Sequence, residues 1–362
     1  MRTAWIALAL AALSSAVAAR PAAACAPAPP PGVRVQIAEE SALIVWDAQA
    51  KREHFIRRAA FRTTGKEFGF LVPTPGKPEL AEVGDEIFDR LEQATKPGVV
   101  YDSKLRGVEP TSLCLGMFLL RASKSAPASA IAAAPVRVLD TLRVAGYDAV
   151  VLEADDPRAL ADWLEEHGYA SRPELTAWLA PYVADKWKIT AFKIANQEGS
   201  NAVGTAAVRM SFPAERPFYP YREPADQREN LPAGAPGERL LRVFYVGTER
   251  VDGSIGAAQK PWPGKAIWSD KLEAAPGVGA LPVTAPAGAW LTMFEDRASP
   301  RPGTEDLFFT PAADRKAVKP PPVVIEVAEK LPLPLDLIGG GALAVGLYLR
   351  RRRQTDAKSK GD

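Results

Sequence analysis

Proline is the feature that most limits what this chain can fold into. The sequence holds 34 prolines among 362 residues, about 9% against an average of about 5%. Because proline lacks a backbone N–H and clashes with the preceding helical turn, a bundle of long helices is excluded. Hydrophobic residues make up 47% and charged residues 24%, as in ordinary globular proteins, so we expect a buried core.

Between the prolines, the pattern predicts strands interrupted by a few helices. Strands are predicted over 42–47 and over 53–62, where the pattern alternates enough for the second strand to pair with the first across a turn near 48–52. Further strands are predicted over 33–37, 67–72, 146–152, 186–194, 206–212, 242–247, 290–295 and 306–310. The fold class that follows is α+β with largely antiparallel sheets, in two lobes, with the seam near the small-residue segment 122–135.

Three amphipathic helices are predicted among these strands. Apolar spacing places the first within 84–95. Asp156 followed by Pro157 marks the start of the second, since proline is tolerated in the first turn. Ser171 and Glu174 have the spacing of a capping box at the start of the third.

Residues 1–24 predict a cleaved secretory signal peptide. Arg2 provides the positive start, an apolar run covers 5–13, and three alanines at 22–24 suit signal peptidase. A second candidate cleavage site follows the small residues at 16–18. The apolar run is too short for a hydrocarbon core of ~30 Å, so an uncleaved anchor is the weaker alternative.

Cys25 and Cys114 are the two cysteines of the chain. An exported protein meets an oxidising environment, so we predict that they form a disulfide. Two alternatives remain: Cys25 as an acylated lipoprotein residue, which Arg20 and Pro21 disfavour, and Cys114 as a buried free thiol in the apolar run 113–120.

The C-terminal end has the pattern of a membrane anchor. The apolar sequence LIGGGALAVGLYL at 337–349 is followed by Arg350, Arg351, Arg352 and Arg353. We predict a transmembrane helix over 335–349, with the four arginines as the membrane stop and 350–362 as a basic cytoplasmic tail. Prolines within 313–334 predict a semi-rigid stalk. Alternatively, the three glycines at 339–341 resemble a bacterial sorting tail that a rhomboid-type protease removes.

Charge is distributed unevenly along the chain. The formal net charge is +2, from 45 basic and 43 acidic residues. Residues 350–362 hold six basic and two acidic side chains, and residues 25–349 hold 37 basic and 41 acidic ones. The extracytoplasmic domain predicted over 25–312 therefore lacks the basic excess of nucleic-acid-binding proteins, and no nucleic-acid partner is expected.

Four segments carry a resemblance to a known family. They are REHFIRRAAF…EFGFLVPTPGKPEL at 52–80, GYDAVVLEADDPRALADWLEEHGY at 146–169, WKITAFKIA at 187–195 and RMSFPAERPFYPYR at 209–222. They resemble the bacterial family known as domain of unknown function 2330. The resemblance implies an exported bacterial protein and carries no catalytic residue. Many members begin with a cysteine-rich segment, whereas this chain has Cys25 followed by APAPPPG.

The residues contain no recognisable catalytic, cofactor or metal motif. Two cysteines and two histidines, His54 and His167, fall short of a structural zinc site, and no glycine-rich phosphate loop is present. Glu153, Asp155 and Asp156 form a carboxylate cluster that could serve as an acid/base pair, although one of them is expected to cap a helix. Catalytic, cofactor-binding and metal-ligating residues are therefore predicted as none.

An aromatic, proline-rich segment offers a second hypothesis. The segment 212–221, with Trp262 and Trp268, could line a groove for a peptide or sugar, although such residues more often fill a core. We therefore predict an exported envelope protein, anchored by its C-terminal segment in the membrane, whose ectodomain lies in the periplasm or outside the cell. Its expected role is binding or structural, with an envelope protein or glycan as partner. The alternatives are a carboxylate-dependent hydrolase and a surface protein processed at its tail.

Overall fold

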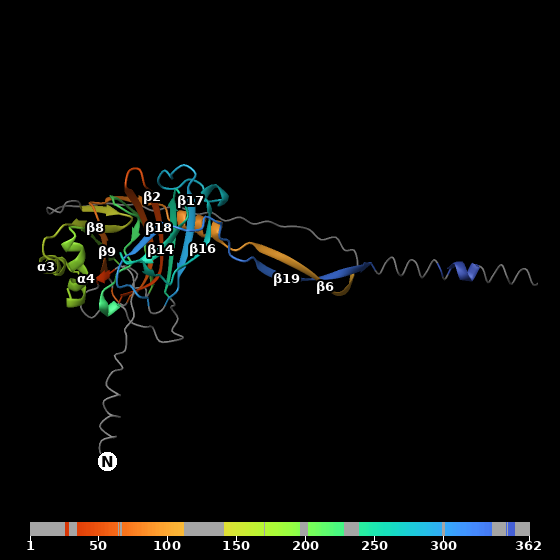
Figure 1. Cartoon of the computed structure of the whole chain (residues 1–362). Helices are drawn as coiled ribbons and strands as arrows, with labels where there is room; N and C mark the ends of the chain where they lie inside the picture. Colours follow the sequence, from red (N-terminus) through yellow and green to blue (C-terminus); the bar gives the residue numbers. More distant parts are fainter. Residues whose placement is uncertain are drawn as a thin grey trace, which may run out of the picture. The chain divides into compact units, whose positions relative to one another are not determined.

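A computed structural model of the protein describes residues 26–28, 35–63, 65, 67–111, 141–169, 171–195, 202–227, 239–298, 301–334, 345 and 347–351. The chain divides into two compact units. Unit 1 consists of Met1–Lys96 and Ala133–Pro320, and unit 2 consists of Pro97–Ala132 and Pro321–Asp362. The predicted α+β class with largely antiparallel sheets is confirmed (Figure 1).

The largest sheet of unit 1 has eight strands. Seven run in the order β16-β17-β13-β2-β3-β11-β5, and β10 also pairs with β3. Every neighbouring pair is antiparallel except β13 with β2, which is parallel. The strands are β2 (Val35–Asp47), β3 (Arg52–Thr63), β5 (Glu79–Val83), β10 (Ala202–Gly204), β11 (Ala207–Pro213), β13 (Leu240–Gly247), β16 (Lys265–Lys271) and β17 (Trp290–Asp296).

Two smaller antiparallel sheets complete unit 1. The five-stranded sheet has the order β1-β4-β9-β8-β7, and the four-stranded sheet has the order β12-β18-β14-β15. The first contains β1 (Ala26–Ala28), β4 (Glu67–Thr74), β7 (Thr141–Val144), β8 (Tyr147–Leu152) and β9 (Lys188–Ala195). The second contains β12 (Phe218–Tyr219), β14 (Val251–Ile255), β15 (Lys260–Pro261) and β18 (Leu307–Pro311).

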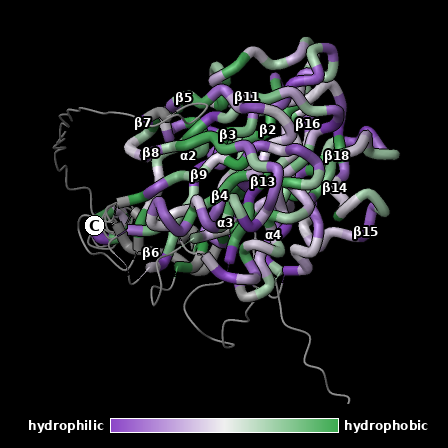
Figure 2. Tube along the Cα trace, turned by 90° about the vertical axis from the view of Figure 1, so that its left-hand side faces the viewer, coloured by the Kyte–Doolittle hydropathy of each residue, from purple (hydrophilic) through white to green (hydrophobic). Residues whose placement is uncertain are grey.

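The sheets and helices of unit 1 form layers around three apolar clusters. Successive side chains of a strand point to opposite faces, so β2 sends Ile44 to the cluster shared with the five-stranded sheet and Leu43 to the cluster beneath α2 (Glu86–Thr95). A third cluster packs the far face of the five-stranded sheet against α3 (Pro157–Glu166) and α4 (Pro173–Ala184). Figure 2 shows hydrophobic stretches where β2, β3 and β13 pass through the middle of this unit.

Of the helices α2, α3 and α4, α3 begins with a side-chain cap, whereas α2 and α4 do not. Asp156 accepts hydrogen bonds from the backbone N–H groups of Arg158 and Ala159 at 2.6 and 3.1 Å, so the predicted cap of α3 is confirmed. The capping box predicted at Ser171 is wrong, because Arg172 occupies the cap position of α4. Proline disfavours helical backbone in the residue before it, and Arg172, before Pro173, is extended. Two short 3-10 turns, η1 (Ala225–Gln227) and η2 (Leu272–Ala274), lie in connections.

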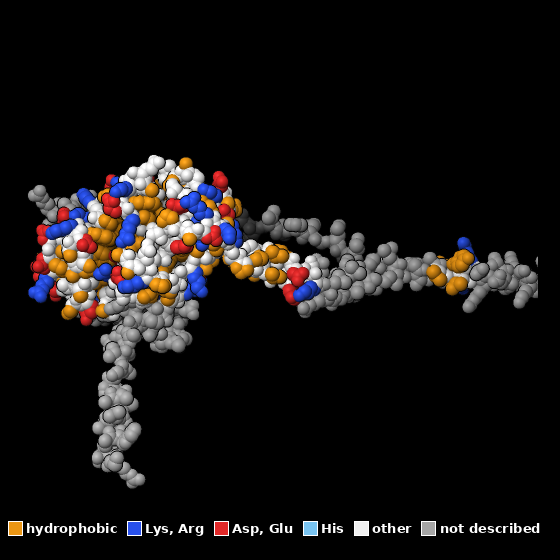
Figure 3. All heavy atoms as spheres, in the orientation of Figure 1, with side chains coloured by type: hydrophobic (Ala, Val, Ile, Leu, Met, Phe, Trp, Pro, Cys, Tyr) orange, Lys and Arg blue, Asp and Glu red, His pale blue; other side chains and the backbone are white. Residues whose placement is uncertain are grey.

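In unit 2, two strands form a parallel ribbon. β6 (Val99–Thr111) pairs with β19 (Val323–Pro334) along its whole length. Residues 323–334 belong to the predicted proline-rich stalk. One face of the described ribbon carries Val99, Tyr101, Val323, Ile325 and Val327, all exposed. The other carries Val100 and Val324, also exposed, together with the charged Asp102, Lys104 and Glu326. Figure 3 shows the hydrophobic side chains beside this charged group.

Several predicted features fall outside the residues that the structure describes. The signal peptide, the lobe seam at 122–135 and most of the predicted membrane segment are among them. Across the described ranges, no helix is both long enough and apolar enough to cross a bilayer.

Candidate functional site

The predicted disulfide and membrane stop are largely outside the described residues. Cys25, Cys114, Arg352 and Arg353 are not described, so both predictions stay predictions. Arg350 and Arg351 are exposed at the end of a short helical stretch, 347–351.

The carboxylates Glu153, Asp155 and Asp156 do not converge on one pocket. Glu153 pairs with Lys188 and Asp155 with Lys186, both at 2.5 Å, while Asp156 caps α3. The Asp155 side chain is 91% exposed. The hydrogen bond from Lys186 and its charge lower the pKa of Asp155, whereas a general acid needs a raised one. This cluster therefore has the character of surface ion pairs and a helix cap.

The aromatic segment is core rather than groove. Five of its members are buried in the main apolar cluster: Phe212, Phe218, Tyr219, Tyr221 and Trp262. Trp268 is buried in the cluster beneath α2. Tyr221 and Trp262 donate their polar hydrogens to the buried carboxylate of Asp296 at 2.7 and 3.1 Å, as buried aromatic residues with polar ends commonly do.

Both histidines have structural contacts. His54 Nδ1 lies 2.8 Å from the Ser211 hydroxyl on the neighbouring strand, and burial lowers its pKa. The ring of His167 stacks on Trp163 with centroids 3.8 Å apart, and its Nδ1 lies 2.7 Å from the Trp163 carbonyl oxygen. His54 thus links β3 to β11, and His167 packs at the C-terminal end of α3.

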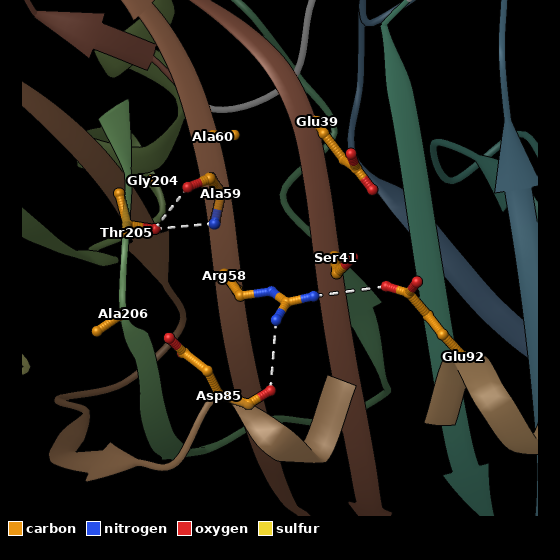
Figure 4. Close-up of a pocket in the computed structure, with 10 residues that line it drawn as sticks. All are labelled: Glu39, Ser41, Arg58, Ala59, Ala60, Asp85, Glu92, Gly204, Thr205 and Ala206. Carbon is orange, nitrogen blue, oxygen red and sulfur yellow. Dashed lines mark hydrogen bonds and ion pairs between the residues drawn. The ribbon is translucent and has the colours of Figure 1, made fainter. Parts of the chain in front are cut away.

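A pocket lies where the apolar face beneath α2 gives way to charged residues. We call it the α2–β3 pocket; its volume is about 530 Å³. Ligand pockets commonly measure ~300 to 1,000 Å³. It is drawn in Figure 4 and lined by Glu39, Ser41, Arg58, Ala59, Ala60, Asp85, Glu92, Gly204, Thr205 and Ala206.

A β-bulge forms one wall of the pocket. Gly204 pairs with Ala60 and Val208 pairs with Arg57, so three residues of one chain segment face two residues of β3. Thr205 repairs the interruption: its hydroxyl accepts from the Ala59 N–H at 2.8 Å and donates to the Ala59 carbonyl at 2.9 Å (Figure 4). Buried backbone groups require such partners, so the wall is rigidly supported.

Arg58 crosses the pocket and ties β3 to α2. Its guanidinium donates to the Asp85 carbonyl oxygen at 3.4 Å, to Asp89 at 3.0 Å and to Glu92 at 3.5 Å. Asp85 in turn accepts the Ala207 N–H at 2.6 Å. The N-terminal end of α2 is thereby joined to two strands, β3 and β11, through polar contacts.

Arg242 on β13 extends this arrangement into a network. It lies 3.6 Å from Glu92 and 3.4 Å from Glu295, and it also pairs with Glu39. Glu295 continues to Arg297 at 3.0 Å. The side chains of Arg58, Glu92, Arg242 and Glu295 are between 18% and 26% exposed, so their attraction is screened less than that of fully exposed pairs.

Ser41 on β2 lines the pocket. In the register of the sheet it lies between Arg242 on β13 and Arg58 on β3, and these side chains share the face that carries α2. The residue is 3% exposed and lines the pocket. Within the described residues, its hydroxyl has no hydrogen-bond partner.

The residues that line this pocket are suited to binding a ligand. Its ten described lining residues include no histidine, cysteine or lysine, and the described part of the chain contains no group of three or more His, Cys, Asp or Glu placed to hold a metal ion. The lining carboxylates of Glu39 and Glu92 are engaged by arginines. Such carboxylates attract cations and accept hydrogen bonds.

Other charged groups of unit 1 lie in its interior. Arg57 and Glu40 form an ion pair at 2.5 Å with side chains 3% and 0% exposed, and the Arg57 guanidinium lies 4.7 Å from the centroid of Phe70. Burial raises the pKa of Asp306 to about 6, although its carboxylate accepts from the Tyr182 hydroxyl at 2.8 Å and the Arg222 N–H at 3.0 Å. Burial also raises the pKa of Glu53 well above its usual value. These groups lie within the packed interior, and none of them lines the pocket.

The sequence analysis missed the residues of this pocket. One signal was present: Arg57 and Arg58 stand side by side between the apolar residues 55–56 and 59–61, so the two charges must point to opposite faces of the sheet. Arg57 faces the core and Arg58 faces α2. The pairing of Arg58 with Glu92 had no comparable local signal.

Comparisons with known proteins identify a family and no function. No curated protein matches the chain. Among solved structures, it is similar to the crystal structure of baculovirus P35, at 8% sequence identity and a TM-score of 0.33, over 80% of this chain and 96% of that one. These values are too low to infer a shared fold. A family model described as "Uncharacterized protein conserved in bacteria (DUF2330)" matches residues 19–230, a range that includes all ten lining residues. The chain belongs to this family of bacterial proteins.

Proposed function

We propose that this protein is an exported, membrane-anchored bacterial envelope protein whose ectodomain binds a ligand in the α2–β3 pocket and does not catalyse a reaction. The observation that carries the proposal is the pocket itself, in which the Ser41 hydroxyl, without a hydrogen-bond partner among the described residues, lies among ion-paired carboxylates and arginines. A few well-placed polar groups in a concave site are what ligand recognition requires.

The alternative of a carboxylate-dependent hydrolase has less support. Acid/base catalysis needs two groups with different pKa values within reach of the same substrate atoms. Glu153 and Asp155 are bound to separate lysines, and the carboxyl groups with raised pKa, Glu53 and Asp306, are fully buried. Substrate access to those two groups would require opening the core.

The proposed location rests on the two ends of the sequence. The signal pattern over 1–24 and the apolar segment before four arginines support a location of the bulk of the chain outside the cytoplasm. The proposed Cys25–Cys114 disulfide requires the same oxidising compartment. An envelope protein or glycan is the expected partner, and a tail removed after export is the alternative fate of the C-terminus.

Two reporter fusions test the location. Alkaline phosphatase, which is active only outside the cytoplasm, is fused after Pro320 or after Asp362. We expect activity from the first fusion and none from the second. Activity in neither contradicts export, and activity in both contradicts the proposed topology of the tail.

Binding is tested by a screen with the full-length protein in detergent. Envelope glycans and peptides are added, and the melting temperature is measured for the wild type, for Arg58→Gln and for Asp155→Asn. A ligand that binds in the pocket raises the melting temperature of the wild type and of Asp155→Asn, but raises that of Arg58→Gln less. Turnover of any compound that Asp155→Asn abolishes favours the hydrolase instead.

A further inference from the structure

We infer that the α2–β3 pocket recognises an alkylammonium group, as on a lysine side chain or another primary amine, with the Ser41 hydroxyl as one of its hydrogen-bond acceptors. This inference rests on the proposed binding function and names the ligand class of the same site.

The charge balance of the pocket and its ion-pair network favours a cation. Five carboxylates, from Glu39, Asp85, Asp89, Glu92 and Glu295, stand against three guanidinium groups, from Arg58, Arg242 and Arg297. The balance is −2. An anionic ligand would have to displace carboxylates from Arg58 and Arg242, each of which already has at least two acidic partners.

Ser41 is the second and independent observation. Its hydroxyl lines the pocket and has no hydrogen-bond partner among the described residues, so it is open to a donor on a ligand. Ser41 is 3% exposed, and in Figure 4 it lies between Glu39 and Glu92. The carboxylates of these two residues are shared with Arg242 rather than saturated by it, since a carboxylate has about four acceptor positions.

The form of the cation follows from these acceptors. An ammonium group carries three N–H donors around one compact charge, whereas a guanidinium is planar and needs paired acceptors along one edge. One hydroxyl with separate carboxylates beside it matches the ammonium. The bulge at Thr205 leaves the small residues Ala206 and Gly204 on the opposite wall, which leaves room for an alkyl chain.

The probe is N-acetyl-lysine N-methylamide, added to the full-length protein in detergent and followed by saturation-transfer NMR. Two matched probes are its Nε-acetylated form, which is neutral, and N-acetyl-glutamate N-methylamide, which is anionic. We expect the lysine probe to bind at least tenfold more tightly than either, with an affinity that falls as salt is raised. Equal binding of the neutral probe, or tighter binding of the anionic one, overturns the inference.

Three variants locate the binding. Ser41→Ala keeps every charge and should weaken the lysine probe about fivefold to tenfold, since a hydrogen bond to a charged group is lost. Glu92→Gln should weaken it at least tenfold, while Arg58 keeps Asp89 and Arg242 keeps Glu295. Glu249→Gln is the matched control: Glu249 is 29% exposed and pairs with Arg315, whereas Glu92 is 25% exposed. It should leave the affinity unchanged.

Each remaining outcome has a distinct meaning. If Glu92→Gln and Glu249→Gln behave alike while both keep the wild-type melting temperature, the probe binds elsewhere and the inference is wrong. If the lysine probe does not bind, but an envelope glycan or neutral peptide does and Arg58→Gln weakens it, the proposed binding function stands and the inference about the ammonium group fails. If no compound binds in the pocket, both fail.

Discussion

Two pairs of strands of equal length have opposite surroundings in this protein. β2 and β3 in unit 1, and β6 and β19 in unit 2, each pair a strand of 13 residues with one of 12. Side chains of β2 and β3 pack into apolar clusters on both faces of the sheet. By contrast, every described side chain of the β6–β19 ribbon is exposed.

The contrast shows that strand pairing and the burial of side chains contribute separately to stability. β2 and β3 are antiparallel neighbours in an eight-stranded sheet, with further strands on either side. β6 and β19 are parallel and form a sheet of two strands, an arrangement that is marginally stable unless its faces are covered. Prolines at 332 and 334 sit on β19, which fits an edge position. Four predictions for variants, in order of decreasing effect, and one hydrogen-exchange comparison test this difference.

The largest effect is expected at the buried ion pair. Arg57→Met removes the charge that neutralises Glu40 in the core, so the free energy of unfolding should fall by about 3–5 kcal/mol. Adding Glu40→Leu should recover most of this loss, because apolar side chains can replace a buried ion pair. Chemical denaturation measures the free energy of unfolding of the single and the double variant. A loss below about 1 kcal/mol in the single variant contradicts the assigned burial.

The free energy of unfolding should depend on pH through the buried carboxyl group of Asp306. The pKa of Asp306 is about 6 in the folded chain and 3.8 as its ordinary value, so between these values the folded state binds more protons. Stability from this group is therefore greatest at low pH and declines as pH rises through this window.

The size of this pH effect is on the order of 3 kcal/mol between pH 4 and 7. Asp306→Asn keeps an acceptor for Tyr182 and Arg222 but cannot titrate. Urea denaturation of both proteins across this range should show the wild type gaining stability relative to the variant as pH falls. Parallel curves for the two proteins contradict a raised pKa at Asp306.

An exposed side chain with fixed backbone partners should have an intermediate effect. Asp156→Ala removes two hydrogen bonds at the start of α3 and should cost about 1 kcal/mol, as helix caps do. Asp156→Ser should restore most of the stability, because serine also caps helices. Thermal denaturation distinguishes the two variants, and equal losses would mean that the cap is not the cause.

The smallest effects are expected in the ribbon. Lys104 pairs with Asp102 and Glu326 with its side chain 50% exposed, and Val324 is 57% exposed. Lys104→Met and Val324→Ala should change the free energy of unfolding by less than about 0.5 kcal/mol.

Hydrogen exchange compares the two pairs of strands directly. Backbone amides of β6 and β19 should exchange much faster than those of β2 and β3. Slow exchange in the ribbon, or a large effect of Val324→Ala, would mean that a partner or another part of the chain covers the ribbon.

The local features of this fold were readable in the sequence. The apolar residues at 42–46 and the alternating pattern at 53–62 predicted the β2–β3 hairpin. Both patterns follow from the way in which successive side chains of a strand point to opposite faces of the sheet. The Asp156–Pro157 pair predicted the start of α3, because a cap acts within one turn. The capping box at Ser171 failed for an equally local reason, the effect of Pro173 on the residue before it.

The sequence by itself therefore determined the α+β class, the main strands, the start of α3 and the family to which the chain belongs, since these follow from periodicity and short motifs. The tertiary structure decided the parallel pairing of β6 with β19 and the assembly of the α2–β3 pocket. Ser41, Arg58, Glu92 and Thr205 come from separate elements of unit 1. Contacts between such distant residues depend on strand order, register and a bulge, which no local pattern specifies.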